Sequence, residues 1–181
     1  MKNVRPAFEV WEKDVSELPP GYQKITCHMI FDVKMGENFR RKARFVADGH
    51  KTKTPAAMTY SSVVSRDSVC IALTIAALND LDIMACDIQH ADLTADCREK
   101  CWTAAGPEFG SEAGLPMIIK KALYGLKSSG AAFRAHLAET LDAMGYKPSY
   151  ADPDVWLRPA VKPNGFKCYA YILCYVDDVL C

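Results

Sequence analysis

The sequence lacks any uninterrupted apolar run long enough to cross a membrane, and no apolar core of a signal peptide follows its first residues. It also lacks internal repeats, low-complexity tracts and an obvious linker. Half of its 181 residues are apolar, which is a globular composition and not a disordered one. We therefore expect an intracellular, non-secreted chain with no membrane partner and one packed domain.

A net charge is also missing, because 22 basic residues balance 22 acidic ones. This balance argues against a protein that binds nucleic acid non-specifically through bulk charge. The charge is nevertheless uneven, with a basic cluster between positions 40 and 53. Its members are Arg40, Arg41, Lys42, Arg44, Lys51 and Lys53. Taken alone, this basic cluster is either a solvated surface or an anion-binding site.

No Cys-x-x-Cys motif occurs among the eight cysteines. Most of the cysteines lie in apolar stretches, so we expect buried thiols of a reducing compartment. An alternative interpretation is that Cys97 and Cys101 supply half of the ligands of a zinc site, although no matching His/Cys pair follows at a usable spacing.

The predicted elements alternate between strands and helices in mixed order. After a lead-in over residues 1–22, we predict strands over 24–34, 39–47, 81–88, 100–103, 117–122, 155–158 and 167–176, and helices over 65–79 and 131–144. Asp67 or Ser68 is the expected cap of the first helix. The mixed order favours an α+β fold, with a mixed or antiparallel sheet and packed helices.

Two adjacent aspartates, Asp177 and Asp178, follow an apolar, strand-like run. Neighbouring like charges repel each other and resist desolvation. A third carboxylate, Asp87, ends the predicted buried strand over 81–88. If the two strands are neighbours, the three carboxylates meet at one sheet edge and suit two Mg²⁺ ions for in-line nucleotidyl transfer. A solvated turn is the alternative, because Asp is a common turn residue.

Four sequence blocks then identify a family resemblance. Tyr175-Val176-Asp177-Asp178 resembles the catalytic turn of reverse transcriptases. Three further blocks resemble those of copia-type (Ty1/copia, Pseudoviridae) long-terminal-repeat retrotransposons: Lys42 to Gly49, Asp87 to Leu93, and Lys121 to Ser129. Their order and spacing agree with that class from about residue 10 to the C-terminus.

The resemblance implies a right-hand polymerase fold, with fingers and a partial palm over residues 23–181, and RNA-directed DNA synthesis. It implies that Asp87, Asp177 and Asp178 are catalytic and bind two Mg²⁺ ions, with Mn²⁺ as an alternative. The backbone carbonyl of Ile88 would add a further metal ligand.

The resemblance also implies a nucleotide-binding set. Lys42 and Arg44 match residues that meet the phosphates of the incoming nucleotide. Gly125, Leu126 and Lys127 match the block beneath the template and the nucleotide. Asp92 stands where the family has an aromatic ring beneath the deoxyribose, so sugar discrimination and nucleotide affinity are both expected to differ.

The implied partners are an RNA or DNA template with its primer and a deoxynucleoside triphosphate. Thumb, RNase H and integrase domains of a polyprotein are expected partners that this chain does not contain. The implied location is the cytoplasm, a virus-like particle or the nucleus. The alternative is a catalytically inactive, truncated remnant that at most binds nucleic acid through residues 40–53. A palm-type nucleotide cyclase would share the carboxylates but not the block at 124–127.

Overall fold

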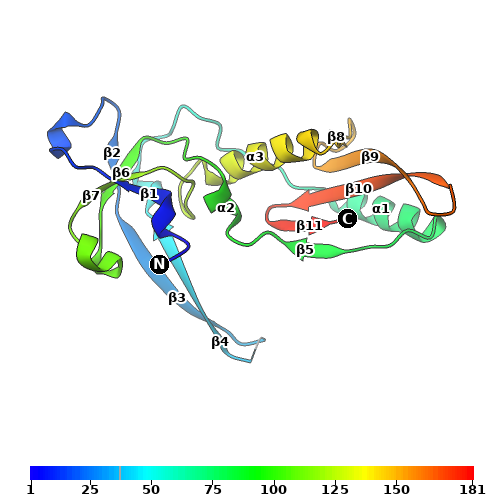
Figure 1. Cartoon of the computed structure of the whole chain (residues 1–181), viewed down its shortest axis with the longest axis horizontal. Coiled ribbons are helices and arrows are strands. Elements are labelled where there is room, and N and C mark those ends of the chain that lie inside the picture. The colour runs from blue at the N-terminus through cyan, green and yellow to red at the C-terminus, as the bar shows by residue number, and fades with distance from the viewer. Residues whose placement is uncertain (37) are drawn as a thin grey trace. The chain divides into compact units, whose positions relative to one another are not determined.

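The computed structural model describes residues 1–36 and 38–181, which divide into two compact units. The first unit comprises Met1–Tyr60 and Asp92–Phe133, and the second comprises Ser61–Ala91 and Arg134–Cys181. Both contain strands and helical segments, which confirms the α+β class (Figure 1). No helix in the described ranges is both long and apolar enough to span a membrane.

The first unit contains a four-stranded sheet in the order β1-β7-β6-β2. Its strands are β1 (Phe8–Val10), β7 (Pro116–Ile119), β6 (Cys101–Ala104) and β2 (Gln23–Lys24). All pairs are antiparallel except β2 with β6. Short 3-10 helices lie at η1 (Arg5–Ala7), η2 (Val15–Glu17), η3 (Gly49–Lys51) and η4 (Pro107–Glu112). The predicted lead-in therefore contributes one strand of this sheet.

Three phenylalanines form the centre of the first unit's core. Phe8, Phe45 and Phe109 pack edge to face in every pair, with ring centroids 5.2–5.8 Å apart. Cys101 and Met117 are fully buried beside them. Edge-to-face packing places the positive ring edge against the negative ring face, which stabilises the cluster beyond simple burial.

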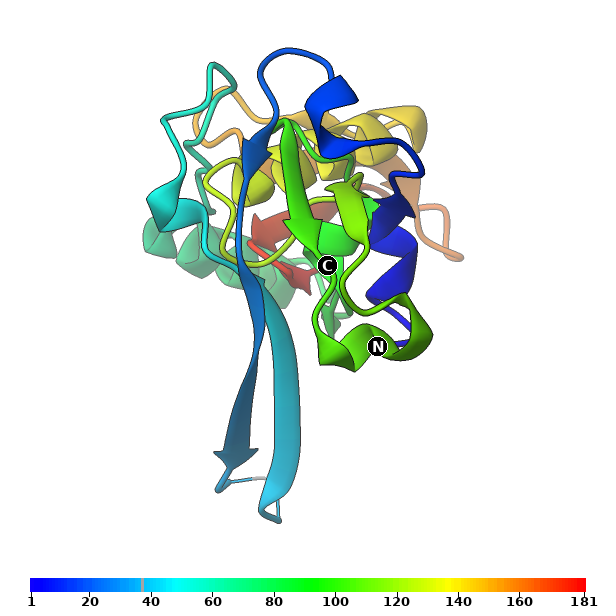
Figure 2. The same ribbon diagram turned by 90° about the vertical axis from the view of Figure 1, so that its left-hand side faces the viewer.

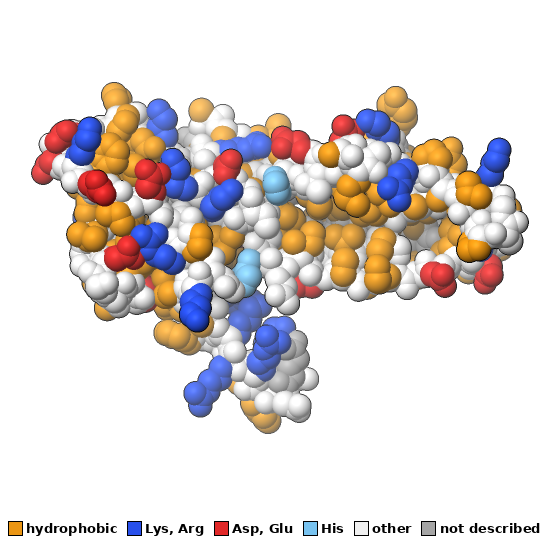
Figure 3. Space-filling view, viewed as in Figure 1, with side chains coloured by type: hydrophobic (Ala, Val, Ile, Leu, Met, Phe, Trp, Pro, Cys, Tyr) orange, Lys and Arg blue, Asp and Glu red, His pale blue; other side chains and the backbone are white. Residues whose placement is uncertain are grey.

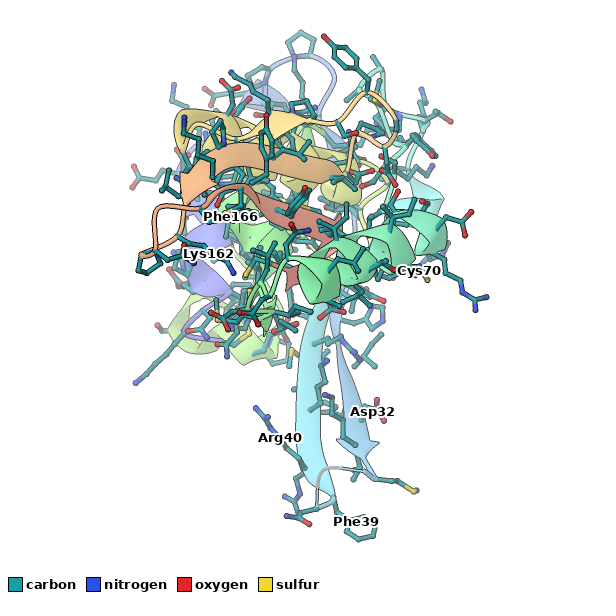
Figure 4. The ribbon with its side chains drawn as sticks, turned by 90° about the vertical axis from the view of Figure 1, so that its right-hand side faces the viewer. Asp32, Phe39, Arg40, Cys70, Lys162 and Phe166 are labelled. Carbon is teal, nitrogen blue, oxygen red and sulfur yellow. The ribbon has the colours of Figure 1, made fainter. Side chains whose placement is uncertain are left out.

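A β-hairpin projects from the other elements of the first unit, as Figure 2 shows. Strands β3 (Cys27–Lys34) and β4 (Arg40–Ala47) pair antiparallel along their whole length, which confirms the predicted hairpin. Its base is anchored by Phe45 in the core, whereas Phe31 further along is 77% exposed. Phe39 and Arg40 lie at the outer end (Figure 4). The outer half of the hairpin is therefore available for contacts.

Two glycines let the chain after Ala122 lie directly on the end of β4. The Tyr124 carbonyl accepts a hydrogen bond from the Ala47 amide at 2.9 Å. Gly125 has φ +97°, and a Cβ atom there would lie 2.2 Å from the Ala47 carbonyl oxygen. A Cβ atom at Gly49 would lie 2.2 Å from the Gly125 carbonyl oxygen. Only glycine at both positions allows this contact.

The second unit contains an antiparallel sheet in the order β5-β11-β10-β9-β8. The strands are β5 (Ala85–Asp87), β8 (Lys147–Pro148), β9 (Val155–Val161), β10 (Lys167–Tyr175) and β11 (Asp178–Leu180). Helix α1 (Arg66–Leu78) belongs to this unit, while α2 (Ala91–Thr94) and α3 (Ser129–Ala143) cross the boundary between the units along the chain. Leu141 of α3 packs with Tyr146, Trp156 and Cys174 in the core.

Two local predictions need correction. The strand expected to be buried over 81–88 is only β5, and all three of its residues are exposed because β5 is an edge strand of its sheet. The cap of α1 is Ser65 and not Asp67 or Ser68, since the Ser65 hydroxyl accepts a hydrogen bond from the Ser68 amide at 3.1 Å.

The expected burial of the cysteines is only partly correct. Cys101 and Cys174 are buried, but Cys70 and Cys86 are exposed, and all eight thiols are free. Figure 4 shows Cys70 on the outer side of α1. The reason is that α1 and β5 each turn an apolar face outward, so an apolar neighbourhood in the sequence did not guarantee burial.

Two buried aspartates tie the start of α1 to β9. Asp152 accepts hydrogen bonds from the Ser65 amide at 2.9 Å and the Ser68 hydroxyl at 2.7 Å. Asp154, only 3% exposed, accepts bonds from Arg134 at 2.8 Å and from the Ser62 hydroxyl. Burial alone would raise the pKa of Asp152, but these hydrogen bonds outweigh burial and lower its pKa below the ordinary value.

The glycine contact predicts a specific loss of stability. Gly125→Ala should lower the free energy of unfolding of the first unit by about 2–4 kcal/mol, because it adds both a steric clash and backbone strain. Gly114→Ala is the matched control, since Gly114 has φ +88° but no atom within 4 Å of an added Cβ. Urea unfolding should show a clearly smaller loss for the control. Equal losses would show that the contact with β4 contributes nothing.

Asp152 predicts a pH-dependent stability. Because its folded-state pKa lies below the unfolded value of about 4, its carboxylate contributes stability above that pH. This contribution is lost as the pH falls through the folded-state pKa. Asp152→Asn should therefore be less stable than the parent chain at pH 7, with the difference shrinking in urea titrations at pH 4 and pH 3. A difference that does not change with pH would contradict this interpretation.

Candidate functional site

A tight hairpin turn joins β10 to β11 in the second unit. Tyr175 pairs with Asp178, so Val176 and Asp177 form a two-residue loop. Val176 has φ +56°, the sign found at the first central position of a type II′ turn. A β-branched residue is strained there by roughly 1–3 kcal/mol, and such strain is typical of functional sites.

The sheet register places two of the predicted carboxylates directly opposite each other. Strand β11 lies between β10 and β5, and Asp178 pairs with Asp87. The predicted strands over 81–88 and 167–176 are not direct neighbours, because β11 lies between β5 and β10, but the pairing of β11 with β5 still sets Asp178 opposite Asp87. The Ile88 amide also donates a hydrogen bond to the Asp177 carbonyl at 2.8 Å, which fixes the turn against the strand that carries Asp87.

The hydrogen-bond pattern identifies the kind of pair that these aspartates form. Met84 and Cys181 exchange both backbone hydrogen bonds, at 2.6 and 2.8 Å. Since bonded and non-bonded pairs alternate along an antiparallel ladder, Asp87 and Asp178 form a non-hydrogen-bonded pair, three positions along. The Cα atoms of such pairs are about 4.5 Å apart, and their side chains are closer than in bonded pairs.

Two carboxylates so close together repel each other in the absence of a cation. Directly opposed like charges destabilise a sheet. Asp87 and Asp178 are exposed, and Asp177 is partly buried. Asp87 and Asp178 line a hollow of about 480 Å³ whose other walls are mainly apolar, including Val69 and Leu173. A larger apolar groove of about 650 Å³ beside α1 includes none of the three aspartates.

The donor atoms fit a hard divalent cation by their chemistry, since they are carboxylate oxygens. Their side chains do not converge fully, because no group of three His, Cys, Asp or Glu side chains in the described residues is placed to hold one ion. The backbone therefore sets two carboxylates opposite each other on neighbouring strands, with Asp177 next to them in sequence. Whether Ile88 contributes its carbonyl stays a prediction.

The strand behind the turn is held on one side by two segments. The Cys174 amide donates to the Asp154 carbonyl at 3.0 Å, and the Cys174 carbonyl accepts from the Val64 amide at 2.9 Å. One partner is the buried Asp154 itself, and the other, Val64, directly precedes Ser65, whose amide donates to Asp152. The turn therefore rests on a strand whose register is locked by backbone hydrogen bonds.

The predicted nucleotide-binding residues all belong to the first unit. Lys42 and Arg44 are two residues apart on β4 and so share a face, as predicted. Both are partly exposed, and Figure 3 shows Lys and Arg side chains gathered on the projecting hairpin. Asp92 lies in the first turn of the short helix α2 and is partly buried.

The residues of the 125–127 block differ in their access to solvent. Gly125 is exposed, but Leu126 is only 6% exposed and belongs to the core. The Lys127 ammonium group donates a hydrogen bond to the Thr52 carbonyl. Contact with a ligand through the Leu126 side chain would therefore need the core to open, whereas backbone contact would not.

Sequence reasoning missed three residues near these sites. Tyr124 is 58% exposed, and the Arg44 guanidinium lies 5.9 Å from its ring centroid. Asp154 supports the strand behind the turn, and its partner Arg134 lies twenty positions before it in the chain, with no motif to link them. Val176 could have been found, because a valine inside a two-residue hairpin loop is unusual.

The thiols of Cys27, Cys97 and Cys101 in the first unit are partly or fully buried and have no evident chemical role. Burial raises the pKa of the Cys27 and Cys97 thiols to about 11, and that of Cys101 to about 12. Protonated thiols are weak nucleophiles and weak metal ligands.

Comparisons with known proteins identify the family to which the chain belongs. The family model described as reverse transcriptase (RNA-dependent DNA polymerase) matches residues 8–181. No solved structure gives a significant match.

Several curated relatives are transposon polyproteins. The Pol polyprotein from transposon TNT 1-94 of Nicotiana tabacum is 28% identical over 99% of this chain and 14% of that protein. The Pol polyprotein from transposon RE1 of Arabidopsis thaliana is 31% identical over 98% of the chain and 12% of that protein. The Ty1-NL2 Gag-Pol polyprotein of Saccharomyces cerevisiae is 35% identical over 75% of the chain and 8% of that protein.

The chain thus spans about one seventh or less of the length of these relatives. The family model nevertheless covers nearly all of it, including every predicted site residue. The chain therefore belongs to the reverse transcriptase (RNA-dependent DNA polymerase) family, within the copia-type retrotransposon Pol polyproteins.

Proposed function

We propose that the chain performs the nucleotidyl-transfer chemistry of an RNA-directed DNA polymerase. The observation that carries the proposal is the register that sets Asp178 opposite Asp87 beside a strained two-residue turn. Directly opposed carboxylates are unfavourable for a fold that has no use for a cation. The presence of such a pair on two separate strands supports a catalytic role for Asp87, Asp177 and Asp178.

In this proposal the two units correspond to two parts of a right-hand polymerase. The first unit, with its projecting basic hairpin, would be the fingers, and the second unit, with the aspartate turn, would be part of the palm. The polymerase domain would extend over residues 23–181, with residues 1–22 as a lead-in that adds β1 to the sheet of the first unit. The division of the chain into two compact units supports this assignment.

The catalytic residues would act by holding charge in fixed positions. Asp87, Asp177 and Asp178, together with the Ile88 carbonyl, would hold two Mg²⁺ ions. When bound, such ions activate the attacking primer hydroxyl and neutralise the departing pyrophosphate. The strained turn at Val176 would keep in place the backbone that carries Asp177 and Asp178, so that only the side chains would move when the ions bind.

The substrate would be a deoxynucleoside triphosphate paired to an RNA or DNA template with its primer. Lys42 and Arg44 would bind the triphosphate, because cations on one strand face match a row of phosphate oxygens. Gly125, Leu126 and Lys127 would support the template and the nucleotide. Asp92, in place of an aromatic ring, would weaken the rejection of ribonucleotides. The other polyprotein domains would supply the grip on the primer.

One observation favours a second candidate function, nucleic-acid binding without catalysis. The hairpin combines cations with exposed aromatic rings, including Phe31 and Phe39, and this combination suits unpaired bases and phosphates. Among the described residues no third side chain completes a cation site at the aspartates. An inactive remnant of the polymerase would keep the hairpin with its cations and aromatic rings, and it would not need a complete cation site.

Primer extension on an RNA template tests the proposal. With Mg²⁺, the parent chain should extend the primer, whereas Asp87→Asn and Asp177→Asn should each lose at least about 100-fold in rate because they remove a cation-binding carboxylate. Asp82→Asn is the matched control, because Asp82 is an exposed carboxylate of the same unit. No extension by the parent chain, together with retained template binding, would favour the second candidate.

The opposed charges also predict an effect on stability. Without divalent ions, Asp178→Asn should raise the free energy of unfolding by a few tenths of a kcal/mol, because it removes one of two opposed charges. Adding Mg²⁺ should raise the melting temperature of the parent chain more than that of the variant. Thermal unfolding with and without Mg²⁺ measures both effects. A variant that is less stable than the parent, and equally sensitive to Mg²⁺, would contradict the proposed site.

A further inference from the structure

Asp154 carries a charge that is almost fully buried in the second unit, and it lies outside the proposed cation site. The residue is 3% exposed. Each of its carboxylate oxygens has a partner from a different segment, because Arg134 of α3 donates to Oδ1 at 2.8 Å and the Ser62 hydroxyl donates to Oδ2. Apolar residues of similar volume often stabilise a fold as well as a buried ion pair does. Stability alone therefore does not explain why a charge stands here.

The backbone of the same residue holds the strand that leads to the aspartate turn. The Asp154 carbonyl accepts a hydrogen bond from the Cys174 amide at 3.0 Å, and the Cys174 carbonyl accepts one from the Val64 amide at 2.9 Å. Val64 follows Ser62 by two positions, so these contacts close a ring that begins and ends at Asp154. Cys174 cannot shift along the strand without breaking hydrogen bonds of this ring.

The ring of contacts lies close to the turn along the chain. Only two residues separate Cys174 from Asp177. Strand β11 pairs with β10 and sets Asp178 opposite Asp87. A displacement of β10 at Cys174 is therefore passed to both aspartates of the turn, because backbone hydrogen bonds join the two strands.

We propose that Asp154, bound by Arg134 and Ser62, is a positioning residue for the divalent cation. Its ionised carboxylate holds β10 so that the aspartates of the turn keep their register against β5. It does not touch the ion, and it acts through the Cys174 amide. The charge is required because a carboxylate accepts hydrogen bonds from both partners, whereas an amide presents its NH₂ group to one of them. This inference rests on the proposed function, because it concerns the cation site on which that function depends.

Binding of Mn²⁺ to the full chain tests this inference without the polymerase reaction. Electron paramagnetic resonance measures the free ion during titration with MnCl₂ and so gives the Kd. Asp154→Asn should raise this Kd by about 10- to 100-fold, the usual loss when a group that supports the ligands is removed. Asp87→Asn, which removes a proposed ligand, shows the size of a direct effect. A Kd in Asp154→Asn equal to that of the parent chain would overturn the inference.

Two control variants separate positioning from general stability. Leu137→Ala shortens a partly buried side chain of α3 that packs on the core of the same unit, so it should lower the free energy of unfolding but leave the Kd within about twofold. Asp142→Asn removes an exposed carboxylate paired with Lys147 and should also leave the Kd unchanged. Equal losses of Mn²⁺ affinity in Leu137→Ala and Asp154→Asn would show that Asp154 acts only through stability, and would refute the positioning role.

A milder pair of variants decides the question if Asp154→Asn does not fold. Ser62→Ala removes one donor to the carboxylate and should raise the Kd by roughly 3- to 10-fold. Ser62→Thr keeps a hydroxyl and should bind within about twofold of the parent chain. Amide hydrogen exchange at Cys174 and Val64 should become faster in Ser62→Ala and not in Ser62→Thr. An unchanged Kd in Ser62→Ala would contradict the inference, whatever the exchange rates.

These outcomes are distinct from those of primer extension. If no primer is extended but Asp154→Asn weakens Mn²⁺ binding, the positioning role stands and the catalytic proposal falls. If the chain extends primers while Asp154→Asn keeps both the Mn²⁺ affinity and the rate of the parent chain, the catalytic proposal stands and the positioning role falls. A parent chain that binds no Mn²⁺ also rules out the positioning role.

Discussion

The pairing of β11 between β10 and β5 is the constraint on which the account of the site depends. This arrangement puts Asp178 opposite Asp87 and joins the Asp177 carbonyl to the Ile88 amide. A slip of one residue would turn Asp178 to the other face of the sheet and oppose Asp87 with an apolar side chain. The hydrogen bonds of Cys174 to Asp154 and Val64 resist such a slip from the other side of β10. These backbone hydrogen bonds thus stabilise the register that holds the unfavourable pair of charges.

In the first unit, close steric contact between two segments fixes the relative positions of the predicted site residues. In the second unit, strand register does so. Gly49 and Gly125 bring two sequence blocks into direct backbone contact, although more than seventy residues separate them in the chain. That contact sets the exposed Tyr124 beside Arg44. Two motifs that are separate in the sequence therefore form a single surface, and a change at either glycine would affect both.

The sequence was sufficient to predict the α+β class, the hairpin over 24–47 and the final strands, because strong strand periodicity and short turns are local signals. The adjacency of Asp87 and Asp178 was a hypothesis, since strand order depends on long-range pairing. The burial of the strand over 81–88 was predicted wrongly, because apolar alternation does not reveal that β5 lies at a sheet edge. The roles of Asp154 and Tyr124 could not be predicted, because both depend on partners distant in the chain.

The register itself is the most direct target for measurement. In antiparallel sheets the Cα atoms of non-hydrogen-bonded pairs approach each other most closely, so their Hα protons should give strong cross-strand contacts in NMR spectra. The account predicts nuclear Overhauser effects between the Hα protons of Asp87 and Asp178, and between those of Ala85 and Leu180. Contacts that instead join Asp87 to Val179 would place the carboxylates on different faces and contradict the proposed catalytic site.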